Sequence, residues 1–488
     1  MTAAVSPQLR TRKRLRGFIL VWTFVTLVMG FATFIAIYFA YPLVTGLGAS
    51  ENVALPPQDN GADVVLVQPS ITPAETAVPT EAPTEVPAEE ETEEPVEVAQ
   101  EPTLVAQSVQ ASTPTPEPTV PPVDVDHFEA GIQVQYSLDF NPDNQDGFYR
   151  SVADDLGLPW VKQQVRWEDF EREPGQIDYA ILDFVMPSAE RFGLKMALSI
   201  VTAPDWAREQ GVELGREGPP ADISAYVNFV TSIVQRYPGQ VHAIEVWNEQ
   251  NLDREWTSTG GLSAANYVEM LRQTYTAVKA IDPNVIIISG ALSQTGINDG
   301  VMAVDDFVYL EQMIAAGMLD YADCVGSHVN GFNIGPAEAY NEVVNDPTAQ
   351  FRGPFDNPHH SWSFRSTLEG YRNRIVAANY DVPLCVTEFG WAVGEDLEGV
   401  PEGFGFALDN TLAEQASWIP EAMSMMDNYG WVRLGIIWNF NYAPQAGWDP
   451  NNDNVPYSLI GPNFQFRPAY DAVRSWQSAY NQRMQSGG

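Results

Sequence analysis

Basic side chains are scarce in this sequence, which holds 25 Lys and Arg residues against 64 Asp and Glu residues in a chain of 488. The formal net charge is −39 at pH 7. A surface of that sign repels nucleic acids and anionic lipid surfaces, so neither is an expected ligand. Neutral polymers such as polysaccharides are not excluded by this charge.

Cysteine is also scarce, because the chain has only Cys324 and Cys385. Two cysteines are too few for a disulfide scaffold. Both fall in apolar, strand-like runs, and we interpret them as small core residues. A single disulfide between neighbouring strands is the alternative, and the sequence leaves it open.

Charged side chains are absent from residues 17–40, and five basic residues lie within 10–16. An uncharged stretch of this length is about 36 Å long as a helix, enough to cross a bilayer. Basic flanks stay in the cytoplasm. We therefore expect a basic cytoplasmic flank (1–16), a signal-anchor helix (17–40) and an extracytoplasmic remainder, which places the protein in the cell membrane as a single-pass protein. The alternative is a cleaved signal peptide, since small residues follow at 46–50.

Residues 51–126 lack basic residues entirely and contain 16 acidic residues and 14 prolines. Neither helical nor strand periodicity is present, and low hydrophobicity with charge of one sign is typical of disordered chain. The sequence predicts a disordered linker over 41–126 that spaces the following domain from the membrane.

From residue 127 onwards, short apolar runs alternate with amphipathic helical stretches about eight times. Strands separated by helices indicate parallel βαβ units. Neither a GxGxxG motif after the first strand nor a P-loop is present, which disfavours a doubly wound open sheet. The sequence predicts a (β/α)₈ TIM barrel over 127–488, with strands at 131–136, 160–167, 194–201, 243–247, 285–289, 324–328, 384–388 and 434–438.

Polar and aromatic residues gather where these predicted strands end, which is where the active site of a TIM barrel is built. The strand-end residues, in chain order, are Arg166, Trp167, Trp206, Trp247, Asn248, Glu249, His328, Glu388, Trp391 and Trp438. Two carboxylates among indole rings suit the hydrolysis of a glycosidic bond. One carboxyl group protonates the leaving oxygen, and the other attacks the anomeric carbon or activates water. Aromatic faces stack on sugar rings, and an arginine or amide binds hydroxyl groups.

One set of residues, distributed over 127–488, resembles clan A of the glycoside hydrolases, the cellulase-type and β-xylosidase-type families (family 5 or family 39). The set is Arg166, Trp247, Asn248, Glu249, His328, Thr387, Glu388 and Trp438. The resemblance implies a retaining double displacement with Glu249 as the general acid/base and Glu388 as the nucleophile. It also implies that Asn248 binds the 2-hydroxyl group, Arg166 keeps Glu388 ionised, His328 lines the pocket and Trp438 forms the floor of the sugar site.

Two positions depart from the pattern of that clan. Gln250 stands where many members have proline, which changes the loop more than the chemistry. Asn330 stands where many have a tyrosine that contacts the nucleophile, so this phenol is either missing or supplied from elsewhere.

A pair of histidines, His359–His360, raises the question of a metal site. No acidic or cysteine spacing nearby completes a set of ligands, so we interpret the pair as part of a loop rim near the sugar cleft. No cofactor and no metal are predicted.

The predicted function is that of a retaining glycoside hydrolase, a β-glycosidase, that acts outside the cell on a polysaccharide or oligosaccharide. Membrane contact is expected through the N-terminal helix only. Two alternatives stay open: a catalytically silent barrel that binds glycan, and a structural protein in which the barrel is a spacer.

Overall fold

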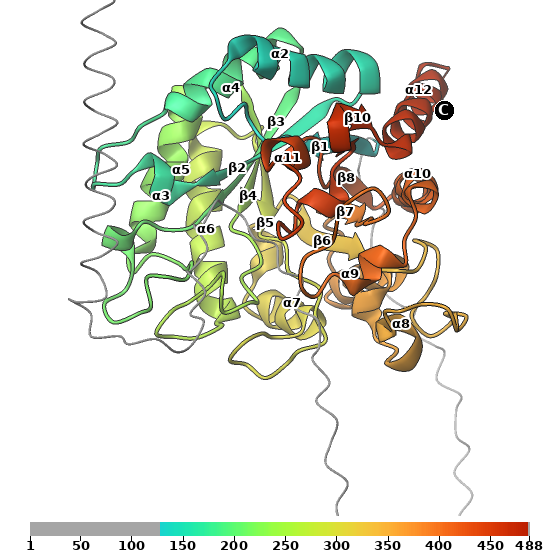
Figure 1. Cartoon of the computed structure of the whole chain (residues 1–488). Helices are drawn as coiled ribbons and strands as arrows, with labels where there is room; N and C mark the ends of the chain where they lie inside the picture. Colours follow the sequence, from blue (N-terminus) through green and yellow to red (C-terminus); the bar gives the residue numbers. More distant parts are fainter. Residues whose placement is uncertain (1–126, 487–488) are drawn as a thin grey trace, which may run out of the picture. The chain divides into compact units, whose positions relative to one another are not determined.

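The computed structural model describes residues 127–486, which form one barrel surrounded by helices (Figure 1). The predicted basic flank (1–16), transmembrane helix (17–40) and linker (41–126) lie outside the described residues. Within 127–486, no helix combines the length and the apolar character needed to cross a membrane.

Eight parallel strands make up the barrel, in the order β5-β4-β3-β2-β1-β8-β7-β6. Bridges between Ile288 and Cys324 and between Leu292 and Ser327 join the two end strands and close the ring. The predicted (β/α)₈ barrel is therefore confirmed, and an open sheet is excluded. The strands are β1 (Glu129–Gln133), β2 (Trp160–Arg166), β3 (Lys195–Val201), β4 (Val241–Val246), β5 (Ile286–Ser289), β6 (Val325–Gly331), β7 (Leu384–Trp391) and β8 (Val432–Ile437).

Each strand is followed by a helix that packs on the outside of the barrel, so the strands are buried on both faces, as parallel strands usually are. The helices are α2 (Pro142–Arg150), α4 (Ala180–Arg191), α5 (Ile223–Arg236), α6 (Ala264–Ile281), α7 (Asp306–Ala315), α9 (Phe364–Ala377), α10 (Leu412–Tyr429) and α12 (Pro468–Gln485). Short elements occupy the loops after β2, β6 and β8, namely α3 (Trp167–Phe170), α8 (Gly353–Asp356), α11 (Tyr442–Gln445), β9 (Ile460–Gly461) and β10 (Gln465–Phe466).

Most of these helices, though not α4 and α12, begin at a residue whose side chain caps the helix. Asp222 and Ser263 accept hydrogen bonds from backbone N–H groups at the start of α5 and α6. Thr411 and Glu414 form a reciprocal capping box at the start of α10. Such caps satisfy N–H groups that the helix itself leaves unpaired, each contributing about 1 kcal/mol.

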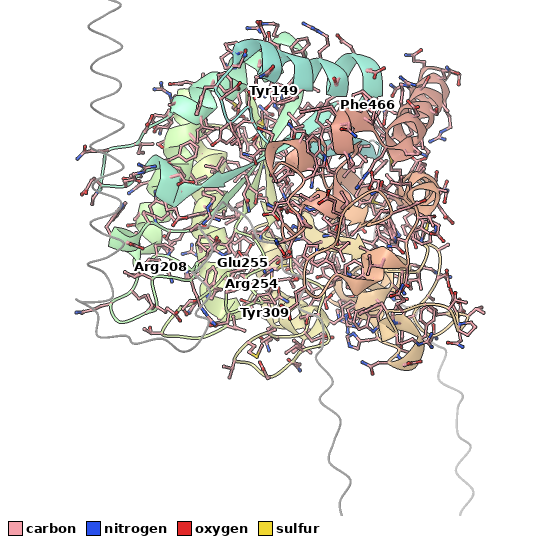
Figure 2. All side chains as sticks on the ribbon, in the orientation of Figure 1. Tyr149, Arg208, Arg254, Glu255, Tyr309 and Phe466 are labelled. Carbon is pink, nitrogen blue, oxygen red and sulfur yellow. A yellow bond between two sulfur atoms is a disulfide. The ribbon has the colours of Figure 1, made fainter. Side chains whose placement is uncertain are left out.

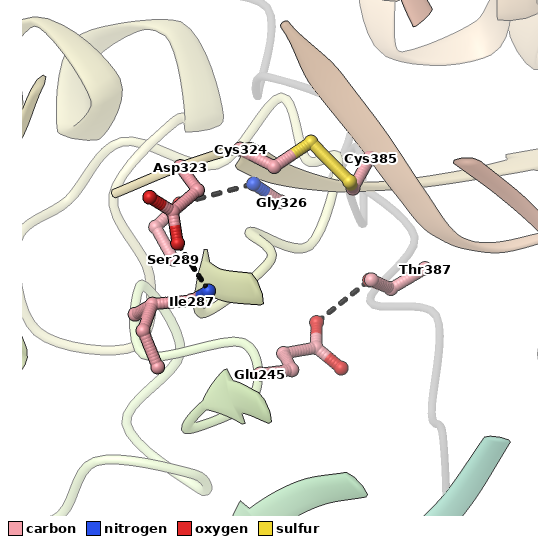
Figure 3. The surroundings of a disulfide bond; sticks show 8 residues. All are labelled: Glu245, Ile287, Ser289, Asp323, Cys324, Gly326, Cys385 and Thr387. Carbon is pink, nitrogen blue, oxygen red and sulfur yellow. Dashed lines mark hydrogen bonds between the residues drawn. A yellow bond between two sulfur atoms is a disulfide. The ribbon is translucent and has the colours of Figure 1, made fainter. Parts of the chain in front are cut away.

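Inside the barrel, the amino-terminal half is filled by an apolar layer, which we call the apolar floor. Its members are Trp160, Ala197, Ala243, Ile288, Cys324, Cys385, Leu434 and Ile436. Cys324 and Cys385 form a disulfide with their Cα atoms 5.7 Å apart (Figure 3). Our interpretation of the two cysteines as free core residues was wrong. The strands β6 and β7 are neighbours, and Cys385 on β7 lies opposite Gly326, two residues after Cys324.

At the joint between β5 and β6, side chains supply part of the hydrogen bonding. The Ile287 N–H donates to Asp323 Oδ2 (2.8 Å), and the Gly326 N–H donates to Ser289 Oγ (3.0 Å) (Figure 3). A Cβ atom on Gly326 would lie 2.0 Å from the Ser289 carbonyl oxygen. Glycine is therefore required for the strands to approach this closely.

Candidate active site

The chain leaves β4 through an unusual backbone turn. Trp247 has φ of 78° and Glu249 has φ of 44°, both in the left-handed region that residues other than glycine rarely adopt. The Glu249 N–H donates to the Ala291 carbonyl (2.8 Å), and Gln250 Nε2 donates to the Gly290 carbonyl (2.8 Å). Left-handed residues cost about 1–3 kcal/mol each and occur often at functional sites. These bonds hold Glu249 in position, and Gln250 anchors the turn to the end of β5.

The Glu249 carboxylate is almost fully buried and has two cationic partners. Its Oε1 lies 3.0 Å from His328 Nδ1, and its Oε2 lies 3.0 Å from Arg254 Nη2. Burial acts to raise the pKa of Glu249, but the hydrogen bond and charge of His328 and the charge of Arg254 outweigh burial and lower it. Arg254 comes from the loop after β4 (Figure 2).

Glu388 lies on β7 and is equally buried, with one of its oxygens held and the other unpaired. Lys162 Nζ lies 3.0 Å from Glu388 Oε1 and also 3.0 Å from Glu245 Oε2. Glu388 Oε2 has no hydrogen-bond partner among the described residues. A buried carboxylate oxygen without a partner is unfavourable unless a ligand or reacting group meets it, so this atom is a candidate nucleophile.

His328, on β6, joins the two candidate carboxylates. Its Nδ1 contacts Glu249, and its Nε2 lies 3.6 Å from Glu388 Oε1. Burial acts to lower the pKa of His328, but Glu388 and Glu249 outweigh burial and raise it. One imidazole ring therefore separates Glu249 from Glu388, and both carboxylates stabilise its protonated form.

We call this buried group the charged layer; it consists of Lys162, Glu245, Glu249, Arg254, His328 and Glu388. Thr387 Oγ1 donates to Glu245 Oε1 (2.6 Å), which ties β7 to β4 (Figure 3). Burial acts to raise the pKa of Glu245, but Lys162, His328 and Thr387 lower it. With His328 protonated, the layer has three cations and three carboxylates, so its charges balance.

Arg166 does not contact Glu388, contrary to the expectation from the resemblance. Its Nη1 pairs with Glu217 (2.5 Å), and its Nη2 pairs with Glu168 (2.5 Å). Arg166 lies four residues beyond Lys162 on β2, which is about 13 Å further along the strand. The cation at Glu388 is therefore Lys162, and Arg166 lies further out at the carboxyl end of the barrel.

Three of the predicted tryptophans are packed into the protein. Trp167, Trp247 and Trp391 are fully buried, and each indole N–H donates to a protein oxygen. Trp167 stacks on Phe229 of α5, with ring centroids 5.5 Å apart. The structure thus places these three side chains in the packing around the barrel, where no indole face is free for a sugar.

Trp438, Trp206 and Asn248 are placed differently. Trp438 is fully buried like those three, but its Nε1 has no hydrogen-bond partner among the described residues. Trp206 is 36% exposed. The side chain of Asn248 is buried and makes no hydrogen bond to the described part of the chain. Each of these three side chains has a polar group or a ring face free for a ligand.

Asn330 does not bring a phenol to Glu388, but Tyr457 in the loop after β8 lies nearby. A Cβ atom added to Gly390, two residues after Glu388, would lie 3.5 Å from the Tyr457 ring. The Tyr457 hydroxyl is buried and has no hydrogen-bond partner among the described residues. Burial raises the pKa of Tyr457, and the charges of Asp453, Glu388 and Glu249 raise it further. Tyr457 is therefore a candidate for the phenol that is missing at Asn330.

Sequence reasoning missed Lys162, Glu245, Arg254 and Tyr457. Lys162 and Glu245 lie within strand-like apolar runs, two residues after Trp160 and Ala243 respectively. Residues two apart share one face of a strand. A charged residue at such a position, in a strand expected to be buried on both faces, was the available signal for Lys162 and Glu245.

One other cluster within 127–486 has the residue types of a metal site, and it lies outside the charged layer. It consists of Asp305, His359 and His360, whose ligand atoms lie within 4.8 Å of one another. These residues come from the loops after β5 and β6, and not from the strand ends.

No model of a known protein family matches the chain, and no curated protein sequence matches it. Solved structures do match. A family 39 glycoside hydrolase from the gut symbiont Bacteroides cellulosilyticus is 18% identical with a TM-score of 0.51, over 74% of this chain and 65% of that chain. A family 39 enzyme from Xanthomonas axonopodis pv. citri is 15% identical with a TM-score of 0.50, over 74% of this chain and 68% of that chain.

The chain thus spans less than two thirds of the length of the first of these structures. At such identities the likeness establishes the fold alone. The described residues have a TIM-barrel fold like that of these two structures, and the resemblance drawn from the sequence is confirmed at the level of the fold.

Proposed function

We propose that this protein is a retaining glycoside hydrolase that cleaves O-glycosidic bonds of a polysaccharide or oligosaccharide outside the cell, anchored to the membrane by residues 17–40. The observation that carries the proposal is the pair Glu249 and Glu388, buried on either side of His328 at the ends of β4 and β7. The oxygens of Glu249 contact His328 and Arg254, whereas Glu388 keeps Oε2 without a partner among the described residues. Two carboxyl groups in different environments are what this reaction requires.

In the first step, Glu388 Oε2 attacks the anomeric carbon while the bond from that carbon to the glycosidic oxygen breaks. The leaving oxygen takes a proton from Glu249. Lys162 pairs with Glu388 Oε1, which leaves Oε2 available for the attack. In the second step, water attacks the anomeric carbon and gives a proton to Glu249, and the ester bond to Glu388 breaks.

The lowered pKa of Glu249 is opposite to what a general acid needs. His328 supplies the proton in our proposal, because its Nδ1 lies 3.0 Å from Glu249 Oε1. Transfer along this hydrogen bond leaves His328 neutral and Glu249 protonated. Asn248 and Trp438 then bind the sugar next to the scissile bond, and Trp206 binds a sugar further out.

A catalytically silent, glycan-binding barrel is the second candidate. The observations that favour it are the lowered pKa of Glu249 and the replacement of a phenol by Asn330. Retention of the unpaired Glu388 Oε2 favours the enzyme.

The test uses the purified full-length protein with a panel of aryl β-glycosides and of plant and bacterial polysaccharides, followed by release of reducing ends. We expect Glu388→Gln to lower turnover at least about 10³-fold with the fold intact. Glu249→Gln should slow polysaccharide cleavage about 10²–10⁴-fold. It should slow the glycosylation step much less for aryl glycosides with good leaving groups, since these need no protonation.

The matched control is Glu311→Gln, the same change at an exposed ion pair on α7, which should leave turnover unchanged. Glycan binding without product release would favour the silent barrel. Equal turnover by the wild type and Glu388→Gln would overturn the proposed mechanism.

A further inference from the structure

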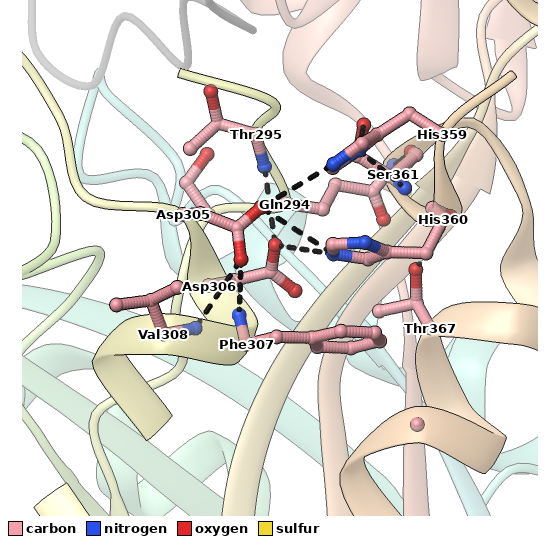
Figure 4. A network of polar contacts seen from close by, with 12 residues as sticks. Gln294, Thr295, Asp305, Asp306, Phe307, Val308, His359, His360, Ser361 and Thr367 are labelled. Atoms are coloured by element: carbon pink, nitrogen blue, oxygen red, sulfur yellow. Dashed lines mark hydrogen bonds and ion pairs between the residues drawn. The ribbon is translucent and has the colours of Figure 1, made fainter. Parts of the chain in front are cut away.

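The loops that follow β5 and β6 meet in a cluster of imidazole and carboxylate groups that the proposed reaction does not use (Figure 4). Asp305 caps α7, because its Oδ1 accepts the N–H groups of Phe307 (3.0 Å) and Val308 (3.2 Å). Its Oδ2 is left to face His359 and His360. The helix cap therefore fixes the carboxylate and turns one oxygen toward the two histidines.

The separations of these atoms fit the coordination of a single metal ion. Asp305 Oδ2 lies 3.6 Å from His359 Nε2 and 3.8 Å from His360 Nε2. Tetrahedral zinc with ligand bonds of about 2.0–2.1 Å places its ligand atoms roughly 3.4 Å apart. We propose that Asp305, His359 and His360 bind a divalent transition-metal ion, and that two imidazole nitrogens with one carboxylate oxygen select zinc.

The charge of the cluster supports a cation. Asp305 and Asp306 are adjacent carboxylates, and Asp306 has no exposed surface. Two adjacent carboxylates, one of them fully buried, favour an added positive charge at the site. A metal ion supplies that charge while meeting an oxygen that the helix cap leaves available.

The surroundings of the histidines hold both rings in orientation. His359 Nδ1 lies 2.9 Å from Ser361 Oγ and accepts the Ser361 backbone N–H (3.3 Å). The ring of His360 stacks on Phe307 with centroids 3.5 Å apart. Outer groups of this kind orient metal ligands. His360 Nε2 also lies 2.9 Å from Asp306 Oδ1, so a metal at this nitrogen displaces a proton.

Metal binding here would join two loops at the carboxyl end of the barrel. Gln294, after β5, already donates to the carbonyl groups of Asn330 (2.7 Å) and Ser361 (2.8 Å). The ion would add a second connection between the same segments. Its role is therefore structural, and it does not depend on the proposed glycosidase activity.

The first experiment titrates the metal-free, full-length protein with zinc chloride by calorimetry and with cobalt chloride by visible absorption. We expect one ion per chain and the intense absorption of four-coordinate cobalt. Asp305→Asn keeps an oxygen for the helix cap but removes the charge, and it should weaken binding at least about 10-fold, as should His359→Ala. His127→Ala, at an exposed histidine, is the matched control and should bind like the wild type.

A second measurement covers the case in which a variant folds poorly. Zinc should raise the melting temperature of the wild type and of His127→Ala but not that of Asp305→Asn, because a ligand that binds only the folded state stabilises it. The proposal is overturned if the wild type binds no zinc, or if Asp305→Asn and His359→Ala bind zinc as tightly as the control.

Discussion

The apolar floor and the charged layer share strands β2, β4 and β7, and they differ in charge, in hydrogen bonding and in how their burial affects stability. On β2 the step from Trp160 to Lys162 crosses from one layer to the other, and on β4 the step from Ala243 to Glu245 does the same. Both steps are two residues, the period with which side chains return to one face of a strand. Two residues along one strand thus separate a position in the apolar floor from a position in the charged layer.

The two layers contribute to stability in opposite ways. Burying the apolar floor is favourable by about 25 cal/mol per Å² of apolar surface. Burying the charged layer is unfavourable except where each charge has a partner, and removing one partner costs about 3–5 kcal/mol. The comparison predicts that single substitutions are most damaging where they leave a charge unpaired.

Lys162→Met gives the largest expected effect. It leaves Glu245 and Glu388 buried without their shared cation, so the free energy of unfolding should fall by about 3–5 kcal/mol. Urea denaturation measures this loss. The matched control is Lys279→Met, at a partly exposed ion pair with Asp323, where about 1 kcal/mol or less is expected. Equal losses at both positions would contradict the distinction between the layers.

The disulfide of the apolar floor gives the next effect. Replacing both Cys324 and Cys385 by alanine removes a cross-link over 61 residues, which should lower the free energy of unfolding by about 2–4 kcal/mol. The charged layer stays paired, so turnover of a cleaved substrate should be unchanged. A double variant with normal stability but no turnover would contradict this prediction, because it would show that the disulfide supports activity and not stability.

The pH dependence of stability gives the smallest effect. The folded pKa of His328 is raised above its usual 6.5, so its contribution is complete below that pH and is lost as pH rises through the raised pKa. The lowered pKa of Glu249, below its usual 4.5, gives a contribution present above that pH and lost as pH falls through the folded pKa.

His328→Gln isolates the histidine contribution. The stability difference between the wild type and this variant should shrink as pH rises above about 6.5, by about 1.4 kcal/mol for each unit of pKa shift removed. Chemical denaturation over a series of pH values measures the difference. A difference that is independent of pH would show that His328 is not charged in the folded protein.

The sequence was sufficient to predict the barrel, because eight alternations of apolar strand and amphipathic helix have few other solutions. The sequence also predicted that Glu249, His328 and Glu388 lie at one end of the barrel, since the carboxyl ends of all eight strands meet there. It could not tell which strand-end side chains turn inward. Trp247 and Glu249 leave β4 with left-handed backbone, so strand alternation no longer holds.

Contacts between segments far apart in sequence were the other limit. The pairing of Glu388 with Lys162, and not with Arg166, depends on how far each residue lies along β2. The disulfide depended on the offset between β6 and β7. Asp305 lies 54 residues before His359, so no local spacing could join them.

The joint between β5 and β6 has a consequence for how the sequence can vary. Most strand pairing relies on backbone groups, which every residue except proline carries alike. At this joint Asp323 and Ser289 accept backbone N–H groups through their side chains, and Gly326 gives the space for the approach. Closure of the ring is thus partly encoded by residue identity, so mutational tolerance should be lower at these three positions than along any ordinary ladder.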